Sequence, residues 1–514
     1  MKSFFRTLRT NPSWGFFLAF AFLAGVSMPL ARIALVASLV FTLANRDRRR
    51  GFRLTSPTVG WLLYLALAAV VTGAVVFFNT DEFLDPAGGF RKLPKLLWYA
   101  AIPLAVVQVD SPIRLSQTLR ALVAGCAVTA LIVLLLNPLL AWVQVSFPFE
   151  FQMSAGTATP SGAFLFRNAE SLGLLKSVQA WIAKCGQPQT YSDALVKVGT
   201  MQAAQRLMVA VPAALCLLVE DARAHAPARA WRTFWLAAIC FAGLVVTFKR
   251  GPAMTCLAAC AVVGFTVLFS RLRWWQSAFV VLLFAGVFVG AGALVPPMRE
   301  RFRELPAELL FPEHTRLRAW QDDYLARNDI RQKLGGRAIL WSYIVPELHR
   351  EHPWGIGFRS LTWKKIHYGM PALDEDTTLS IRRPNRRVEL NLNHVHSTPL
   401  QSFVDFGWAG LAVWTIWMGL GFRATGRTAR RARRPAPGAS VPETACYAAP
   451  LAMFVALFLY GLVEYNLADS EVVLLYGLAM GLTGPSLLHS APVPPSQKDR
   501  SADPTAESQA PNPA

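Results

Sequence analysis

Charged side chains are scarce in this chain of 514 residues: they make up 16% of it, and acidic residues are fewer than basic ones. Soluble proteins usually carry about a quarter charged residues. With an apolar fraction of 54%, the composition excludes disordered, collagen-like and disulfide-scaffold proteins and argues against an ordinary soluble enzyme. A polytopic, all-α membrane protein is the fold class that this composition predicts.

Cysteine is also sparse. Six of the seven cysteines lie in or beside apolar segments, where a thiol packs as a small hydrophobic group, and only Cys185 lies in a long polar loop. No disulfide between loops is therefore expected. Cys256 and Cys260 share a helix face, but no histidine or acidic residue is near them in the sequence, so no metal site is expected there. The chain also lacks an internal repeat, a feature that many transporters have.

Basic residues are in excess, with 51 lysines and arginines against 31 acidic residues and a net charge of +20. In a membrane protein, such an excess orients the helices and attracts anionic lipid or phosphate groups. Membrane lipid is therefore an expected partner, and no nucleic-acid partner is expected.

Apolar segments of membrane-spanning length recur along the chain. A helix needs about 20 mainly apolar residues to cross a bilayer. By this criterion the sequence predicts about twelve spans, with Pro29 as the break between the first two. They are 13–30, 31–44, 57–78, 95–109, 117–136, 196–219, 233–248, 252–270, 277–295, 398–421, 446–463 and 470–488.

Basic residues in the short connections decide the orientation of these spans. With the N-terminus in the cytoplasm, the basic runs within 46–53, 223–232 and 423–434 all fall on the cytoplasmic side. The N-terminal segment is interpreted as an uncleaved first helix, because no A-x-A-type cleavage site precedes a soluble domain.

The same topology divides the chain into four parts. An N-terminal bundle of nine or so spans, 1–295, contains an outer loop at 137–195, and a larger outer loop occupies 296–397. C-terminal helices follow at 398–490, and 491–514 is predicted to be a disordered cytoplasmic tail. The loop at 296–397 is too long for a passive connection, so a folded cap with a function of its own is expected there.

Two histidines, His394 and His396, lie where the larger loop re-enters the membrane. Imidazole titrates near neutral pH and can take a proton from a substrate. The alternative is a pair of interfacial histidines with a packing role, and the two residues alone favour that alternative.

Four cations and a tryptophan are further candidates. Lys249 and Arg250 stand between two apolar runs on the outer side, where a cation pair contradicts the positive-inside pattern and favours anion binding over a snorkelling turn. Arg337, followed by Trp341, offers a planar fork that fits phosphate oxygens, although a surface salt bridge is the simpler interpretation of that segment. Arg206 lies inside a predicted span, where an arginine is a functional candidate.

Several of these segments resemble motifs of the O-antigen ligase/polymerase superfamily. The string from His394 to Gln401, followed by Gly407, Gly410 and Leu411, is similar to the family pattern H-x-H-N-x-x-L-Q-x-x-x-x-x-G-x-x-G-L, with Ser397 in place of the asparagine. The order of the motifs and their placement in the loops carry the resemblance, which covers about 196–490.

Three further segments add to the resemblance. Arg250-Gly251 resembles the family's S-R-G turn, with Lys249 where serine is common. The segments 336–341 and 352–357 resemble its G-R-x-x-x-W and H-P-x-x-G-x-G stretch, and 460–471 resembles its last outer turn.

The resemblance implies a GT-C-like membrane glycosyltransferase of the bacterial inner membrane, acting at the periplasmic face. Its donor would be a glycan on undecaprenyl pyrophosphate, and a ligase would use a sugar hydroxyl of lipid A–core as acceptor, in lipopolysaccharide biosynthesis. No cofactor and no metal are implied. An O-antigen polymerase or a protein O-oligosaccharyltransferase would use the same residues, and a polyprenyl-lipid transporter is a more remote alternative.

The resemblance also implies roles for the candidate residues. His396 is expected to be the catalytic base, and Arg250 and Arg337, assisted by Lys249, are expected to bind the pyrophosphate. Supporting roles fall to His394, Arg206 and Trp341. Direct displacement with inversion at the anomeric carbon is the expected stereochemistry.

Overall fold

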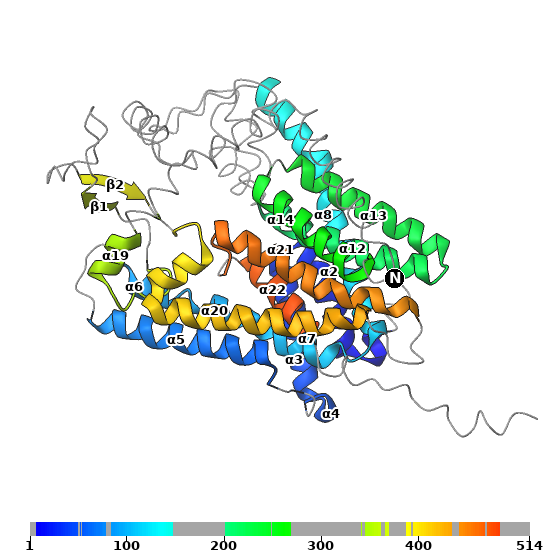
Figure 1. The fold of residues 1–514 in the computed structure, drawn as a ribbon, viewed down its shortest axis with the longest axis horizontal. Helices are drawn as coiled ribbons and strands as arrows, with labels where there is room; N and C mark the ends of the chain where they lie inside the picture. The colour runs from blue at the N-terminus through cyan, green and yellow to red at the C-terminus, as the bar shows by residue number, and fades with distance from the viewer. Residues whose placement is uncertain are drawn as a thin grey trace, which may run out of the picture.

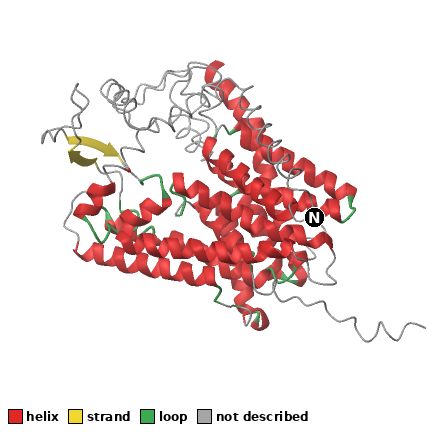
Figure 2. Cartoon of the chain, viewed as in Figure 1, coloured by secondary structure: helices red, strands yellow, loops and turns green. Residues whose placement is uncertain are grey.

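A computed structural model describes residues 7–49, 52, 54–78, 84–146, 201–247, 249–268, 341, 345–360, 365–369, 387–391, 394–433, 441–467 and 470–483. Helices dominate these residues (Figure 2). The prediction of a helical membrane protein is thus confirmed at this level, although the described residues also include two short strands that the sequence did not predict.

The elements follow one another along the chain in this order, where η marks 3-10 helices and, for η2, a π-helix: α2 (Pro12–Val26), α3 (Met28–Ala44), α4 (Arg46–Arg49), α5 (Ser56–Phe78), α6 (Pro86–Phe90), η1 (Leu93–Ala100), α7 (Ala101–Gln108), α8 (Pro112–Ser146), α12 (Met201–Arg223), α13 (Pro227–Val246), α14 (Arg250–Val263), η2 (Gly264–Leu268), α19 (Val345–Glu351), β1 (Lys365–Gly369), β2 (Arg387–Asn391), α20 (Thr398–Arg433), η5 (Val441–Ala448), α21 (Ala449–Val463) and α22 (Ser470–Gly481). The strands pair antiparallel, with Lys365 opposite Asn391.

Six helices among the described residues are long and apolar enough to cross a membrane: Ser56–Phe78, Pro112–Leu136, Met201–Arg223, Pro227–Val246, Thr398–Arg431 and Ala445–Val463. Four shorter apolar helices accompany them in the same part of the chain: Pro12–Val26, Met28–Ala44, Gly251–Val267 and Val472–Gly481. The predicted span 95–109 is divided between η1 and α7, and 277–295 lies outside the described residues. The count of twelve spans therefore remains a prediction.

The break between the first two helices lies before the predicted position. α2 ends at Val26, Ser27 is extended (φ −147°, ψ 117°), and α3 begins at Met28. Pro29 consequently lies in the first turn of α3, where its fixed φ suits a helix and its missing N–H costs no hydrogen bond. The predicted boundary at 30/31 was wrong because proline starts this helix instead of ending the previous one.

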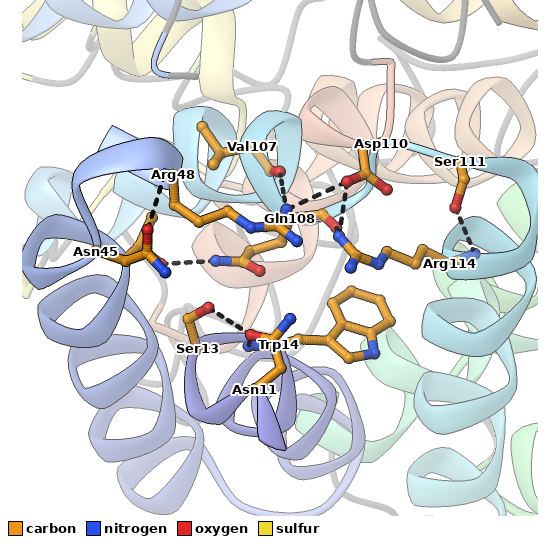
Figure 3. Close-up of polar contacts among 11 residues, drawn as sticks. Asn11, Ser13, Trp14, Asn45, Arg48, Val107, Gln108, Asp110, Ser111 and Arg114 are labelled. Carbon is orange, nitrogen blue, oxygen red and sulfur yellow. Dashed lines mark hydrogen bonds and ion pairs between the residues drawn. The ribbon is translucent and has the colours of Figure 1, made fainter. Parts of the chain in front are cut away.

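Polar side chains cluster at one end of the bundle, where Asp110 accepts from Arg48 at 3.2 Å and from Arg114 at 2.7 Å (Figure 3). The Arg114 guanidinium also lies over the Trp14 ring, 5.0 Å from its centroid. These contacts tie the segment after α3 to the connection between α7 and α8 and to the start of α2.

A second ionic network joins α8, α12 and α13. The Arg120 guanidinium donates to both carboxylate oxygens of Asp221, at 2.9 and 2.6 Å, and Thr233 donates to the same carboxylate at 2.7 Å. Ser116 donates to Glu220 at 2.8 Å. Both networks bring together connections that the charge rule assigns to the cytoplasmic side, as alternating spans require.

The larger loop predicted on the outer side meets helix α5 and the connection that follows it. Phe358 N donates to Thr72 Oγ1 at 2.9 Å, and Asp85 N donates to the carbonyl of Ser360 at 3.1 Å. Figure 1 shows α6, α19 and the β1–β2 ribbon gathered at one end of the bundle, where α5 ends and α20 begins. The segment 355–360 is therefore held by helices that precede it by more than two hundred residues.

Helix α20 is broken near its start. Phe406 (φ −139°, ψ 17°) and Gly407 (φ 61°, ψ −155°) leave helical geometry, and the loop fills the break with main-chain hydrogen bonds. Ile356 N donates to the carbonyl of Val404 at 3.1 Å, and Gly357 N donates to the carbonyl of Asp405 at 2.9 Å.

Glycine is required at this junction on two grounds. Gly355 has φ +91°, and a Cβ there would lie 2.4 Å from the Asp405 carbonyl oxygen. Only glycine adopts such a conformation without strain and allows so close an approach. Gly355 of the G-x-G motif and Gly407 of the G-x-x-G motif thus join the loop to the broken helix, whereas Gly410 packs against Ser402 and Phe406 of α20 itself.

Candidate functional site

The segment His394–Ser397 forms a turn before α20, and its central residue anchors it. Val395 is fully buried, its N–H donates to Gln401 Oε1 at 2.8 Å, and its carbonyl accepts from Trp341 Nε1 at 2.7 Å. Trp341, predicted to support the site, therefore positions the turn. Val395 points into the protein, and the histidines on either side of it have their rings side by side, with centroids 4.3 Å apart.

Both imidazoles meet one carboxylate, that of Glu464 at the C-terminal end of α21. His396 Nδ1 lies 2.8 Å from Glu464 Oε1, and His394 Nε2 lies 3.2 Å from the same oxygen. An ionised carboxylate only accepts hydrogen bonds, so each of these ring nitrogens carries the hydrogen. In neutral His396 the proton is then on Nδ1, and Nε2 has a free lone pair.

Exposure distinguishes the members of this cluster. The His396 side chain is 39% exposed, whereas that of Glu464 is 13% exposed. His396 also has φ +51°, a left-handed conformation that is uncommon outside glycine and that concentrates at functional sites. The turn thus leaves His396 partly exposed and keeps its carboxylate partner covered.

The Glu464 turn is fixed to the start of α20. Thr398 Oγ1 donates to the carbonyl of Glu464 at 3.1 Å, Asn466 N donates to Thr398 Oγ1 at 3.2 Å, and Asn466 Nδ2 donates to the carbonyl of Leu457 at 3.2 Å. Sequence reasoning did not single out Glu464. The available signal was an acidic residue at the end of an apolar helix. The predicted topology places that turn on the outer side of the membrane, as it does the histidine pair.

Gln401, the glutamine of the L-Q motif, links the turn to the broken helix. Its side chain accepts from Val395 N and donates from Nε2 to Asp405 Oδ1 at 2.7 Å. Asp405 is buried, and its carbonyl is one of the groups that hold the 355–357 segment. The motif residues therefore form one connected hydrogen-bonded unit beneath the histidines.

The predicted anion-binding turn lies beside the same helix as Glu464. Helix α14 begins at Arg250, with Lys249 as its extended N-cap (φ −94°, ψ 109°). A Cβ on Gly251 would lie 3.3 Å from the Tyr460 ring, one helical turn before Glu464 in α21. The backbone of the turn is thus near the histidine–carboxylate cluster, while the Arg250 side chain and Arg337 lie outside what the structure describes.

Arg206 has a structural contact. Its side chain is only 8% exposed, and its guanidinium donates to the carbonyl of Val26 at 2.9 Å. Val26 is the last residue of α2, where a helix leaves carbonyls without intrahelical partners. Arg206 therefore caps the break between α2 and α3, which supplies a structural reason for an arginine inside a span.

Two cations that sequence reasoning missed lie close to the cluster. Lys92 Nζ donates to the carbonyl of Arg359 at 3.2 Å, and burial together with the charge of Arg359 lowers the pKa of Lys92. The Arg359 guanidinium lies 5.3 Å from the centroid of the Tyr465 ring, which is 5.7 Å from the His394 ring. The only sequence signal for Arg359 was its position two residues after the G-x-G motif.

Two imidazoles and a carboxylate are also groups that bind metal ions. The ligating atoms of His394, His396 and Glu464 all lie within 4.8 Å of one another, and Zn²⁺ accepts such a set. The separations of 2.8 and 3.2 Å are those of hydrogen bonds, so the geometry is also complete as a base paired with a carboxylate. The expected independence of metal remains a prediction.

Comparison with protein families gives a match over residues 235–415, to a family described as O-antigen ligase. The matched stretch contains Lys249, Arg250, Arg337, Trp341 and both histidines, and it ends before Glu464. No curated protein matches the chain. The resemblance read from the motifs is thereby confirmed at the level of the O-antigen ligase-like superfamily.

Proposed function

With residues 235–415 matching the O-antigen ligase family, we propose that this membrane protein is a glycosyltransferase that joins a glycan to lipid A–core. The donor is the glycan on undecaprenyl pyrophosphate, the acceptor is a sugar hydroxyl, and the reaction takes place at the periplasmic face of the inner membrane. A GT-C-like arrangement of helices and a reaction without metal or cofactor are parts of the same proposal.

The contact between His396 and Glu464 carries the proposal. Nε2 of His396 takes the proton of the acceptor hydroxyl while the hydroxyl oxygen forms a bond to the anomeric carbon of the glycan. Glu464 holds the Nδ1 proton, fixes the ring orientation and stabilises the positive charge that develops on the imidazole. His394, hydrogen-bonded to the same oxygen, keeps the carboxylate in place.

The bond that breaks joins the anomeric carbon to a diphosphate oxygen, and the electron pair leaves with the diphosphate. Fixed cations in a site with little water stabilise this developing negative charge strongly. We assign this task to Arg250 and Arg337, with Lys249 assisting. The approach of α14 to Tyr460 supports the assignment, since it brings the Lys249–Arg250 backbone to the helix that ends at Glu464.

A transfer assay on the purified protein tests the proposal. In detergent, with glycan-linked undecaprenyl pyrophosphate and lipid A–core, the expected product is glycan-bearing lipid A–core. Growth of the glycan on its lipid carrier would instead identify a polymerase, and transfer to serine or threonine of a protein would identify a protein O-oligosaccharyltransferase. If none of the three products forms, the assignment as a transferase is wrong.

A further inference from the structure

We propose that Lys92 and Arg359 form a second anion-binding site, which takes a phosphate group of the acceptor glycolipid. The inference rests on the proposed function and adds to it the chemistry by which the second substrate is recognised. Neither residue is needed to explain proton transfer or departure of the diphosphate, and neither was a candidate from the sequence.

Two cations are held together here by the backbone. The Lys92 ammonium donates to the carbonyl of Arg359 at 3.2 Å. The carboxylates of Asp85, which is also the N-cap of α6, and of Asp405 act on the same ammonium and favour its charge. Burial and the like charge of Arg359 outweigh these two carboxylates and lower the pKa of Lys92, so an anion bound at this half-buried position would be attracted more strongly than in open water.

The conformation of Arg359 is imposed by its surroundings. Its φ is +48°, and the residues before it are fixed by hydrogen bonds from Gly357 N to the Asp405 carbonyl and from Phe358 N to Thr72. A non-glycine residue in this region is strained and persists only where neighbouring structure determines it. The rigid segment therefore directs a guanidinium to one place over the Tyr465 ring.

The position of this pair relative to the base is defined by Tyr465. That residue directly follows Glu464, carries the Arg359 guanidinium on its ring, and lies 5.7 Å from the His394 ring. An anion bound by Arg359 would consequently be adjacent to the histidine–carboxylate cluster. A phosphate held by Arg359 would therefore position a substrate near His396, whose Nε2 its hydroxyl must reach.

The two groups of cations come from different sides of the cluster. Lys249 and Arg250 begin α14, which packs against α12 and α21, whereas Lys92 lies between α6 and η1, which pack against α5 and α22. Figure 1 shows α6 and α14 well separated, with the end of α21 between them in the view. In a displacement with inversion, the hydroxyl approaches opposite to the leaving group. A cation pair away from α14 therefore suits the acceptor.

The residue types select phosphate. Arginine provides a planar fork that matches two phosphate oxygens, and lysine adds a compact charge with several donors. Each contact is charge-assisted and so contributes more than a neutral hydrogen bond.

Steady-state kinetics of the full-length protein in detergent test the site, with the variants Lys92→Gln and Arg359→Gln. For phosphorylated lipid A–core, each variant is expected to raise the KM about tenfold, the effect of losing one charge-assisted contact. The kcat and the KM for the lipid-linked donor are expected to stay near those of the unaltered protein. With lipid A–core from which phosphate has been removed, variants and unaltered protein should have the same, higher KM.

Matched controls keep the result interpretable. Arg91→Gln removes an exposed cation next to Lys92 and should change none of these constants. Lys92→Arg keeps the charge and should retain most of the affinity, so that loss in Lys92→Gln with retention in Lys92→Arg excludes simple unfolding. A raised donor KM in the variants would place the diphosphate at this pair and overturn the inference, and so would unchanged constants.

Failure of the proposed function can be told apart from failure of this site. If the unaltered protein transfers no glycan, direct binding of phosphorylated and dephosphorylated lipid A–core, measured by thermophoresis, tests the site alone. Tighter binding of the phosphorylated form, lost in Arg359→Gln, would support the site. Equal binding of both forms, or equal binding by the variant, would overturn it.

Discussion

His396 Nδ1 lies 2.8 Å from Glu464 Oε1, although the two residues are 68 positions apart and belong to different connections of the bundle. The contact holds Nδ1 of the more exposed of the two histidines, and in the proposed reaction the other ring nitrogen, Nε2, faces the acceptor hydroxyl. The proposed reaction depends on this pair.

Replacing the imidazole should stop the reaction. His396→Ala is expected to lower kcat at least about a hundredfold, the usual contribution of a positioned general base. The measurement is transfer per mole of folded protein, with His352→Ala as a matched change of another histidine on the same side of the bundle. Transfer at the original rate in His396→Ala would remove this residue as the base.

The carboxylate should act through the histidine. Glu464→Gln retains the size and an acceptor oxygen but loses the charge that stabilises the developing imidazolium, so kcat should fall about tenfold to a hundredfold while both KM values change little. Glu464→Asp should recover part of the loss. Glu351→Gln, at the exposed end of α19, is the control. A large rise in KM with unchanged kcat would mean that Glu464 binds substrate instead.

The junction between loop and helix should be intolerant of side chains. Gly355→Ala forces a residue with a Cβ to φ +91° and places that atom 2.4 Å from a carbonyl oxygen. We expect a loss of about 1–3 kcal/mol in stability and a fall in transfer, because the same segment leads to Arg359. Gly419→Ala, where a Cβ would have no neighbour within 4 Å, should leave both the thermal midpoint and the transfer rate unchanged or slightly higher. Equal effects of the two substitutions would show that the junction is not constrained.

Chelation should leave the reaction intact. If His394, His396 and Glu464 act as a hydrogen-bonded base, treatment with EDTA followed by gel filtration should not change kcat. Loss of activity that Zn²⁺ restores would instead identify the three residues as metal ligands and would replace the proposed mechanism.

Local strings in the sequence were sufficient to single out the histidine pair and the Lys249–Arg250 turn as candidates, because each lies within a few residues at the end of an apolar segment. The role assigned to the histidines came from the family resemblance and remains a prediction. Glu464 could not be identified in this way, since only folding brings the end of α21 to the turn before α20. Arg359 was missed for the same reason: a single arginine after a glycine motif has no visible partner in the sequence.

Arg206 has a structural contact that the sequence does not show. A charge inside an apolar segment signals function on average, and here it also satisfies a carbonyl at the end of α2, while its predicted supporting role remains a prediction. The boundary before α3 was also misjudged from the sequence. Pro29 was expected to mark the break between the first two helices, but it lies in the first turn of α3.

The hydrogen bonds from Ile356 and Gly357 to Val404 and Asp405 are made by peptide groups. The alignment of the loop with the broken helix therefore does not depend on which side chains the rest of the loop carries. Exchange of one apolar side chain for another at Ile356 or Val404 should therefore leave the 355–360 segment aligned with the start of α20.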